Sequence, residues 1–174
     1  MKHLRIHDIS NNYFAEAWTL YENAFPEEER RSIDSQVKLF TNTNFHVDVI
    51  VEKDLFIGLF FWWEFDDVRF VEHFAIAEGA RNKGFGKLIL EQFIDKSQKP
   101  IILEVELPNS DLEQRRIRFY QKTGFHLNSH EYKIPPMEEG GESLQLLIMS
   151  YPDPISKSDV DDFTKQYHPI LFEA

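Results

Sequence analysis

A chain of 174 residues, of which 42% are hydrophobic and 14% aromatic, is long enough to bury a core as one domain and too apolar to be disordered. Its 30 acidic residues against 19 basic ones give a formal net charge of -11, which argues against a nucleic-acid partner, because such a partner needs a broad basic surface. There is no cysteine, which excludes disulfides, cysteine-ligated zinc and a thiol nucleophile. Because the sequence shows neither a signal peptide nor an apolar run of roughly 18 residues, we expect a cytoplasmic protein without a membrane partner.

The first 40 residues predict one strand and two helices. HLRIHDI, residues 3–9, alternates apolar and polar side chains and so predicts a strand. Apolar residues then recur every three or four positions from Phe14, as in a helix, with Asn11 or Asn12 as its cap. EEERRSIDSQVKLF, residues 27–40, turns from charged to amphipathic and predicts a second helix.

Residues 44–76 are rich in Val, Ile, Phe and Trp and predict three antiparallel strands. The breaks between them fall at Lys53-Asp54 and Asp66-Asp67. The middle run, FIGLFFWWEF, is apolar on both alternating faces. This pattern indicates either a central strand covered on both sides or a surface buried in a homodimer.

The second half of the chain alternates between helical and strand patterns. In order these are a helix that fades near Ser97, a strand over 101–107, a helix over 111–125, two closing strands over 126–134 and 143–151, and a short acidic helix over 158–167 without an evident role. Asp111 is the expected cap of the second of these helices, and Gly124 the glycine that ends it. Together the elements predict an α/β domain, a meandering sheet with helices on its faces.

The stretch HFAIAEGARNKGFGKLILEQF, residues 73–93, places three glycines and three cations between a strand and a helix. Free amides at the first turn of such a helix form an anion site. The P-loop ends in Gly-Lys-Ser/Thr, whereas Gly84 is followed here by Phe-Gly, and the dinucleotide motif requires a glycine where Ile89 stands. What remains is R-x-x-G-x-G, made by Arg81, Gly84 and Gly86, for which the alternative is a solvated bend.

This stretch resembles the acetyl-CoA-binding core of the GCN5-related N-acetyltransferases (GNAT), in which Q/R-x-x-G-x-G/A follows the fourth strand and cradles the CoA pyrophosphate. RRIRFYQKTGF resembles the family's F-Y-x-x-x-G-F segment, with Tyr120 as the tyrosine, and FPEEERR resembles the linker between the first two helices of bacterial members. The resemblance implies a mostly antiparallel mixed sheet splayed between strands 4 and 5, with helices on both faces. It also implies a single acyl-CoA N-acyltransferase domain over 1–174, with its core over about 1–150 and a C-terminal extension over 152–174.

The implied activity is the transfer of an acetyl group from acetyl-CoA, a co-substrate, to a primary amine of a small molecule or peptide. Without cysteine, direct attack of the amine on the thioester is the simplest route. By the resemblance, Tyr120 donates a hydrogen bond or proton to the departing thiolate; its alternative is simple helix packing. The alternative function is a non-catalytic acyl-CoA-binding or sensing module.

The resemblance also implies which residues contact coenzyme A. They are the backbone groups of Phe74, Ala75 and Ile76, which the splayed strands leave free; the turn residues Arg81, Asn82, Lys83, Gly84, Phe85, Gly86 and Lys87; Asn109, just past the fifth strand; and Tyr120. Asn109 is alternatively a turn residue at the approach to a helix. Arg115 and Arg116 are expected to be surface charges.

Two carboxylates are candidates for the general base. Strand alternation places Glu72 on the same face as Phe74 and Ile76. On the fifth strand Glu104 and Glu106 share a face, an arrangement that suits a wet cleft where an ammonium docks and a water relays its proton. Glu72 is the first candidate and Glu104 the second, each with an ordinary solvated or ion-paired role as its alternative. The histidines have no metal-binding spacing, so no metal site is expected.

Overall fold

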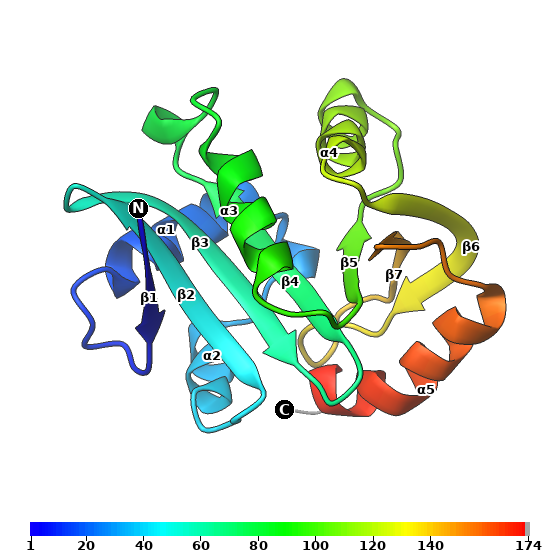
Figure 1. The fold of residues 1–174 in the computed structure, drawn as a ribbon. Helices are drawn as coiled ribbons and strands as arrows, with labels where there is room; N and C mark the ends of the chain where they lie inside the picture. The colour runs from blue at the N-terminus through cyan, green and yellow to red at the C-terminus, as the bar shows by residue number, and fades with distance from the viewer. Residues whose placement is uncertain (173–174) are drawn as a thin grey trace.

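The computed structural model describes residues 1–172, which form one seven-stranded sheet and five α-helices (Figure 1). The strands are β1 Lys2–Ile6, β2 Phe45–Glu52, β3 Leu55–Glu64, β4 Arg69–Ile76, β5 Ile101–Val105, β6 His126–Ile134 and β7 Leu144–Tyr151. The helices are α1 Phe14–Ala24, α2 Ile33–Leu39, α3 Phe85–Asp95, α4 Asp111–Lys122 and α5 Lys157–Phe172, with 3₁₀ turns η1 Glu27–Glu29 and η2 Glu78–Ala80. None of these helices is long and apolar enough to cross a membrane.

The sheet runs in the order β1-β2-β3-β4-β5-β7-β6, and its neighbours are antiparallel except for the parallel pair β4 and β5. That pair holds register only from Arg69 opposite Ile101 to Val71 opposite Leu103. Beyond Val71, β4 continues to Ile76 paired with β3 alone, so β4 and β5 diverge (Figure 1). The predicted mixed sheet, splayed between its fourth and fifth strands, is confirmed.

Two hydrophobic clusters lie on opposite faces of the sheet. One packs against α1, α2 and α5, and the other against α3 and α4 (Figure 1). Strand β3 contributes to both, because Leu59 and Phe61 belong to the first cluster while Phe60 belongs to the second. The doubly apolar run therefore forms a central strand covered on both sides, as one of its two interpretations predicted.

Two predicted caps are wrong in detail. Helix α4 is capped by Ser110 and not by Asp111: the Ser110 side chain accepts from the Glu113 amide, and the Glu113 carboxylate accepts from the Ser110 amide. This reciprocal capping box satisfies two free amides at once, which a lone Asp111 cannot do. Before α1, the Asn11 side chain accepts from the Tyr13 amide two residues on, so it makes a turn and not a helix cap.

The predicted second helix over 27–40 is also split. Only η1 forms at its start, the chain then runs extended, and α2 begins after Ser32, whose side chain accepts from the Ser35 amide. The extended break contains Arg31, which is buried at 6% exposure. The Arg31 side chain therefore lies in the interior of the protein, while Glu27 and Glu28 of the same charged run stay exposed.

Helix α5 extends beyond the acidic helix predicted over 158–167 and packs onto the sheet. Its apolar side chains belong to the core cluster that α1 and α2 also cover: Val160, Phe163, Tyr167 and Leu171. In Figure 1 the helix lies along β6, with its last turn below the lower ends of β4 and β5. It thereby brings the last described turn of the chain to the strands that diverge.

Candidate active site

A hollow of about 610 Å³ opens where β4 and β5 part. Ten of the residues expected to contact coenzyme A line it: Phe74, Ala75, Ile76, Arg81, Asn82, Gly84, Phe85, Gly86, Lys87 and Tyr120. Helix α4 supplies the opposite wall through Leu112, Arg115, Arg116, Phe119 and Tyr120, and the end of α1 closes it through Asn23, Ala24 and Phe25. Arg115 and Arg116, expected to be plain surface charges, thus belong to this wall. The glycine turn, the free edge of β4 and the tyrosine are brought together.

The glycine turn has the geometry of an anion site. Asn82 and Gly84 both have left-handed backbones, with φ of 62° and 81°, and Gly84 begins α3 without a side-chain cap. The first helical bond runs from the Leu88 amide to the Gly84 carbonyl at 3.2 Å. The three preceding amides, of residues 85–87, therefore have no partner within the helix and are free for a ligand.

The cations of the turn have separate roles. The Arg81 Nε donates to the Ile76 carbonyl at 3.0 Å, and the Lys83 Nζ donates to the Gly79 carbonyl at 2.7 Å, so both side chains fasten the turn. Lys83 does not line the hollow, and neither does Asn109, which is exposed in the loop after β5. Lys87 lies on the first turn of α3, exposed and 3.5 Å from a carboxylate oxygen of Glu91.

A second, smaller hollow of about 40 Å³ lies between the diverging strands, which is room for a very few water molecules. Four residues line both hollows: Phe25, Phe74, Arg116 and Tyr120. Tyr120 is 6% exposed, and burial raises the pKa of its hydroxyl to about 12. At neutral pH this tyrosine is therefore a proton donor at the wall between the two spaces.

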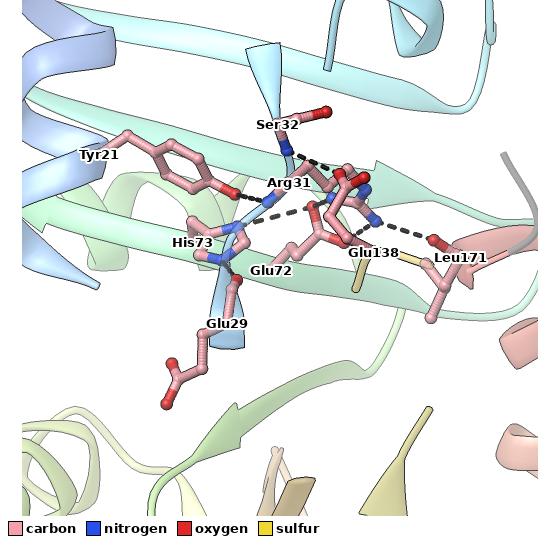
Figure 2. A network of polar contacts seen from close by, with 8 residues as sticks. All are labelled: Tyr21, Glu29, Arg31, Ser32, Glu72, His73, Glu138 and Leu171. Atoms are coloured by element: carbon pink, nitrogen blue, oxygen red, sulfur yellow. Dashed lines mark hydrogen bonds and ion pairs between the residues drawn. The ribbon is translucent and has the colours of Figure 1, made fainter. Parts of the chain in front are cut away.

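Glu72 does not lie where strand alternation predicts. The register of β3 and β4 pairs Phe61 with His73 and Trp62 with Val71, so Glu72 is the extra residue of a β-bulge. Figure 2 shows Glu72 and His73 directed toward the same segment before α2, with the His73 Nε2 2.9 Å from the Glu29 carbonyl oxygen. The expectation that Glu72 shares a face with Phe74 is wrong, because the bulge interrupts the period of two.

The Glu72 carboxylate is held in a buried ion pair. Arg31 donates to its two oxygens at 2.6 and 2.7 Å, and both side chains are 4% exposed (Figure 2). Burial alone would raise the pKa of Glu72, but the Arg31 guanidinium outweighs it and holds the pKa at about 2. Arg31 also donates to the Leu171 carbonyl of α5 at 2.8 Å. The pair therefore links β4, the segment before α2 and the last turn of α5.

Glu104 is buried in a different electrostatic setting. It lies on β5 at the small hollow, and one of its oxygens accepts from the Tyr132 hydroxyl at 2.6 Å. Burial raises the pKa of Glu104 to about 8, although the hydrogen bond from Tyr132 opposes it, and the charges of Glu72 and Glu29 add to the rise. A carboxyl group that titrates near neutrality is suited to accept and release a proton.

Sequence reasoning missed three further groups of this site. Glu29 lines the small hollow, and burial together with the nearby Glu106 raises its pKa to about 7. Phe172 of α5 closes the same hollow. Arg31 holds Glu72. A signal existed for Glu29 and Arg31, because FPEEERR stands at a recognisable place in the chain, but a run of charges is normally a solvated surface.

An acidic groove of about 580 Å³ adjoins the small hollow at Met137, which lines both. Its acidic residues outnumber its basic ones, Arg30 and Arg31: Glu22, Glu27, Glu28, Glu138, Glu139 and Glu142. The negative potential of such a groove attracts cations. Within residues 1–172, no three His, Asp or Glu side chains lie together as they would around a metal ion.

Comparisons with known proteins identify the family and the fold. The family model described as acetyltransferase (GNAT) domain matches residues 43–127. A solved protein from Bacteroides thetaiotaomicron, assigned to the GNAT acetyltransferases, is 32% identical, covers 100% of this chain and 99% of its own, and superposes with a TM-score of 0.90. No curated protein matched the sequence.

More distant structures share the fold. The spermidine N-acetyltransferase SpeG of Vibrio cholerae, solved as a point mutant, is 17% identical over 86% of this chain and 94% of its own, with a TM-score of 0.62. An aminoglycoside 6′-N-acetyltransferase complexed with coenzyme A is 16% identical over 90% of this chain and 100% of its own, with a TM-score of 0.60. At these identities the likeness concerns the fold alone.

Proposed function

The chain belongs to the GNAT family of acetyltransferases, and we propose that it moves the acetyl group of acetyl-CoA to a cationic primary amine by direct attack. One observation carries this proposal: two hollows, one suited to a long anionic ligand and one acidic, share Tyr120 where β4 and β5 part. The large hollow would take the coenzyme, and the small hollow would receive the reacting end of the amine.

Acetyl-CoA supplies an activated thioester and a diphosphate by which it is held. In our proposal the free amides of residues 85–87 bind the diphosphate, supported by the positive end of the α3 dipole. Past Val71, the side of β4 that faces β5 has lost its partner strand, so the backbone groups of Phe74 and the Ile76 amide are available to an extended ligand. The backbone groups of Ala75 are directed toward β3, and the Ile76 carbonyl accepts from Arg81. Lys83 would act indirectly, by fastening the turn.

Tyr120 would protonate the leaving sulfur. Free thiols have a pKa near 8.5, so a tyrosine whose pKa is about 12 stays protonated until a thiolate forms beside it. Its burial and its place in both linings support this role. A tyrosine that served only to pack α4 would not need to border the second hollow.

For the general base we reverse the order suggested by the sequence. Glu72 has both oxygens occupied by Arg31 and a pKa near 2, which makes it a poor proton acceptor. Glu104 has a pKa of about 8 and borders a space of water size, so it would take the ammonium proton through a water molecule. Glu72 would instead keep Arg31 in place and add to the field around Glu104.

The negative charge around the small hollow indicates which class of amine the site would accept. Glu29 and Glu104 both have raised pKa values in the small hollow, and a bound cation would relieve that crowding by favouring their ionised forms. The acidic groove beyond Met137 would attract the rest of a positively charged molecule. We therefore expect amines that carry a second positive charge to be better acceptors than neutral ones of the same length.

The test is release of the coenzyme A thiol across a panel of polyamines, aminoglycosides, amino acids and peptides, with calorimetry of coenzyme A binding in parallel. We expect turnover with one cationic class and little with neutral analogues. Binding of coenzyme A with no thiol release from any amine would favour a non-catalytic acyl-CoA sensor. Failure to bind coenzyme A would refute the proposal.

A further inference from the structure

Tyr132 joins the buried Glu104 to a histidine of the C-terminal helix. Its hydroxyl lies 2.6 Å from a Glu104 oxygen and 2.7 Å from the His168 Nε2. Glu104 comes from β5, Tyr132 from β6 and His168 from α5, so three separate elements meet in an unbroken hydrogen-bonded line. A single hydroxyl proton serves both contacts, so when Tyr132 donates to one neighbour it must accept from the other.

The chemistry proposed above leaves a proton to be removed. An ammonium and a thioester yield an amide, a thiol and one free proton: R–NH₃⁺ + CH₃CO–SR′ → R–NH–CO–CH₃ + R′SH + H⁺. If Glu104 takes that proton, it must lose it before the next turnover. Glu104 is half-buried between strands and borders the small hollow, which the amine and its product would fill in our proposal, so a route on the other side of Glu104 would let the proton leave.

We propose that Glu104, Tyr132 and His168 form a proton relay that returns the general base to its ionised form through α5, an inference that rests on the proposed function. Protonated Glu104 gives its proton to the Tyr132 oxygen while the Tyr132 hydroxyl proton passes to the His168 Nε2. His168 then loses a proton from its other ring nitrogen to solvent. No bond between heavy atoms changes, and the net result is one proton moved out of the cleft. Tyr132 and His168 are thus positioning residues that act through Glu104.

The surroundings of Tyr132 and His168 keep both groups neutral at rest, so the transfer from Glu104 to His168 is uphill and is completed by loss of the proton from His168 to solvent. Burial and the adjacent Glu104 raise the pKa of Tyr132, so it passes a proton on without becoming a tyrosinate. Burial lowers the pKa of His168 to about 4, so the ring is neutral at pH 7 and holds an added proton only briefly. His168 is partly exposed, and its Nδ1 is not one of the buried atoms that lack a partner, so solvent reaches it.

The charged and titratable groups that face the relay come from every element packed around it. They are Arg31 before α2, Glu29 of η1 and Glu72 of β4. The side chains that flank the His168 ring, Phe163 and Phe172, are uncharged aromatic rings. Arg31 and Glu72 neutralise each other. The excess negative charge therefore lies at Glu104 and Glu29, and the net field favours holding a proton at Glu104 until the relay removes it.

The same contacts could serve only to dock α5, and two substitutions with matched controls separate these roles. His168→Gln keeps an N–H that can donate to Tyr132 but cannot carry a proton onward. Tyr132→Phe removes the bridging hydroxyl. The controls are His130→Gln, whose ring contacts the Ile155 carbonyl oxygen, and Tyr167→Phe, whose hydroxyl donates to Asp67.

The relay predicts that His168→Gln and Tyr132→Phe each lower kcat at least tenfold at pH 7.5, with KM for acetyl-CoA within twofold of wild type and both controls within twofold in kcat. The pH dependence then distinguishes the two variants. Tyr132→Phe should move the rise of kcat to higher pH, because the lost hydrogen bond lowered the pKa of Glu104. His168→Gln should leave the midpoint unchanged. Wild-type kcat in His168→Gln from pH 6 to 9 would overturn the relay.

A measurement on the free protein does not depend on turnover. With ¹⁵N-labelled histidine, the ring nitrogens of His168 should report a titration with a midpoint near pH 8, which belongs to Glu104 and is transmitted by the Tyr132 hydroxyl. Glu104→Gln and Tyr132→Phe should each remove this inflection. Its absence from the wild type would refute the relay even if acetyl transfer were demonstrated, and its presence would support the relay even if the acceptor proposal failed.

Discussion

Replacing Glu104 by glutamine should stabilise the folded protein at alkaline pH while removing its activity. Glutamine has nearly the same shape, still accepts from Tyr132 and cannot ionise. In the wild type the pKa of Glu104 rises from 4.5 in the unfolded chain to about 8 in the folded protein. Between these values the folded state binds the extra proton, so the free energy of unfolding falls as pH rises.

The size of the effect follows from that shift. Each pKa unit corresponds to 1.36 kcal/mol, so the full difference is about 5 kcal/mol as an upper limit, reached only above pH 8. Groups distant from Glu104 titrate alike in both proteins and cancel in the comparison, whereas the Glu29 and Glu72 carboxylates are relieved of a neighbouring charge in the variant, which acts in the same direction. We expect the variant and the wild type to be nearly equal in stability near pH 4.5 and the variant to be more stable by a few kcal/mol at pH 9.

Urea unfolding followed by tryptophan fluorescence at the two pH values measures this difference. Glu91→Gln, which changes an exposed carboxylate on α3, controls for the general effect of an amide. The kcat of Glu104→Gln should fall by about 10² or more if Glu104 is the base. The reasoning fails if the variant is equally destabilised at both pH values, because Glu104 would then contribute its packing and not its charge.

Three further substitutions test other parts of the site. Tyr120→Phe should lower kcat about a hundredfold with the calorimetric Kd for coenzyme A within twofold; equal turnover would remove Tyr120 from the mechanism. Gly84→Ala imposes a side chain on a left-handed backbone and should cost about 1–2 kcal/mol and weaken coenzyme A binding, whereas Gly79→Ala, which meets nothing within 4 Å, should do neither. Arg31→Met leaves Glu72 buried with the His73 ring, 3.6 Å away, as its one remaining polar neighbour among the contacts described, and should cost about 3–5 kcal/mol in urea unfolding. Adding Glu72→Met should restore most of that loss, and a double variant no more stable than the single one would contradict the ion-pair argument.

The parts of the fold that follow from local pattern were predictable. The alternation and apolar run of β3 indicate a central strand, and a glycine-rich turn between a strand and a helix indicates free amides. Both signals reside in consecutive residues and need no knowledge of distant partners. The same holds for Tyr120, whose place in α4 is set by a motif of seven residues.

The position of Glu72 was predicted less well, because its environment depends on distant register. Strand alternation assigned Glu72 to the cleft face, but a bulge opposite Trp62 shifts it, and a bulge depends on how β3 pairs with β4. The partner that occupies Glu72 is 41 residues away in a charged run. Nothing local separates an arginine that will be buried from one that will be solvated.

The role of the C-terminal residues was invisible for a similar reason. The pattern over 158–167 predicts a helix, but His168 contacts Tyr132 across 36 residues, and Leu171 contacts Arg31 across 140. Both contacts depend on the tertiary arrangement, which brings α5 next to β6 and to the segment before α2. An isolated helix pattern therefore predicts the element and leaves its task unknown.

The wall shared by the two hollows has a consequence for inhibitor design. Since Phe25, Phe74, Arg116 and Tyr120 border both spaces, a conjugate that tethers the sulfur of coenzyme A to a polycation through a short linker would span them as one molecule. Tethering makes the second engagement intramolecular, with an effective concentration on the order of millimolar. In the proposed function, such a bisubstrate compound would owe its selectivity among related enzymes to the contact between its polycation and the acidic groove.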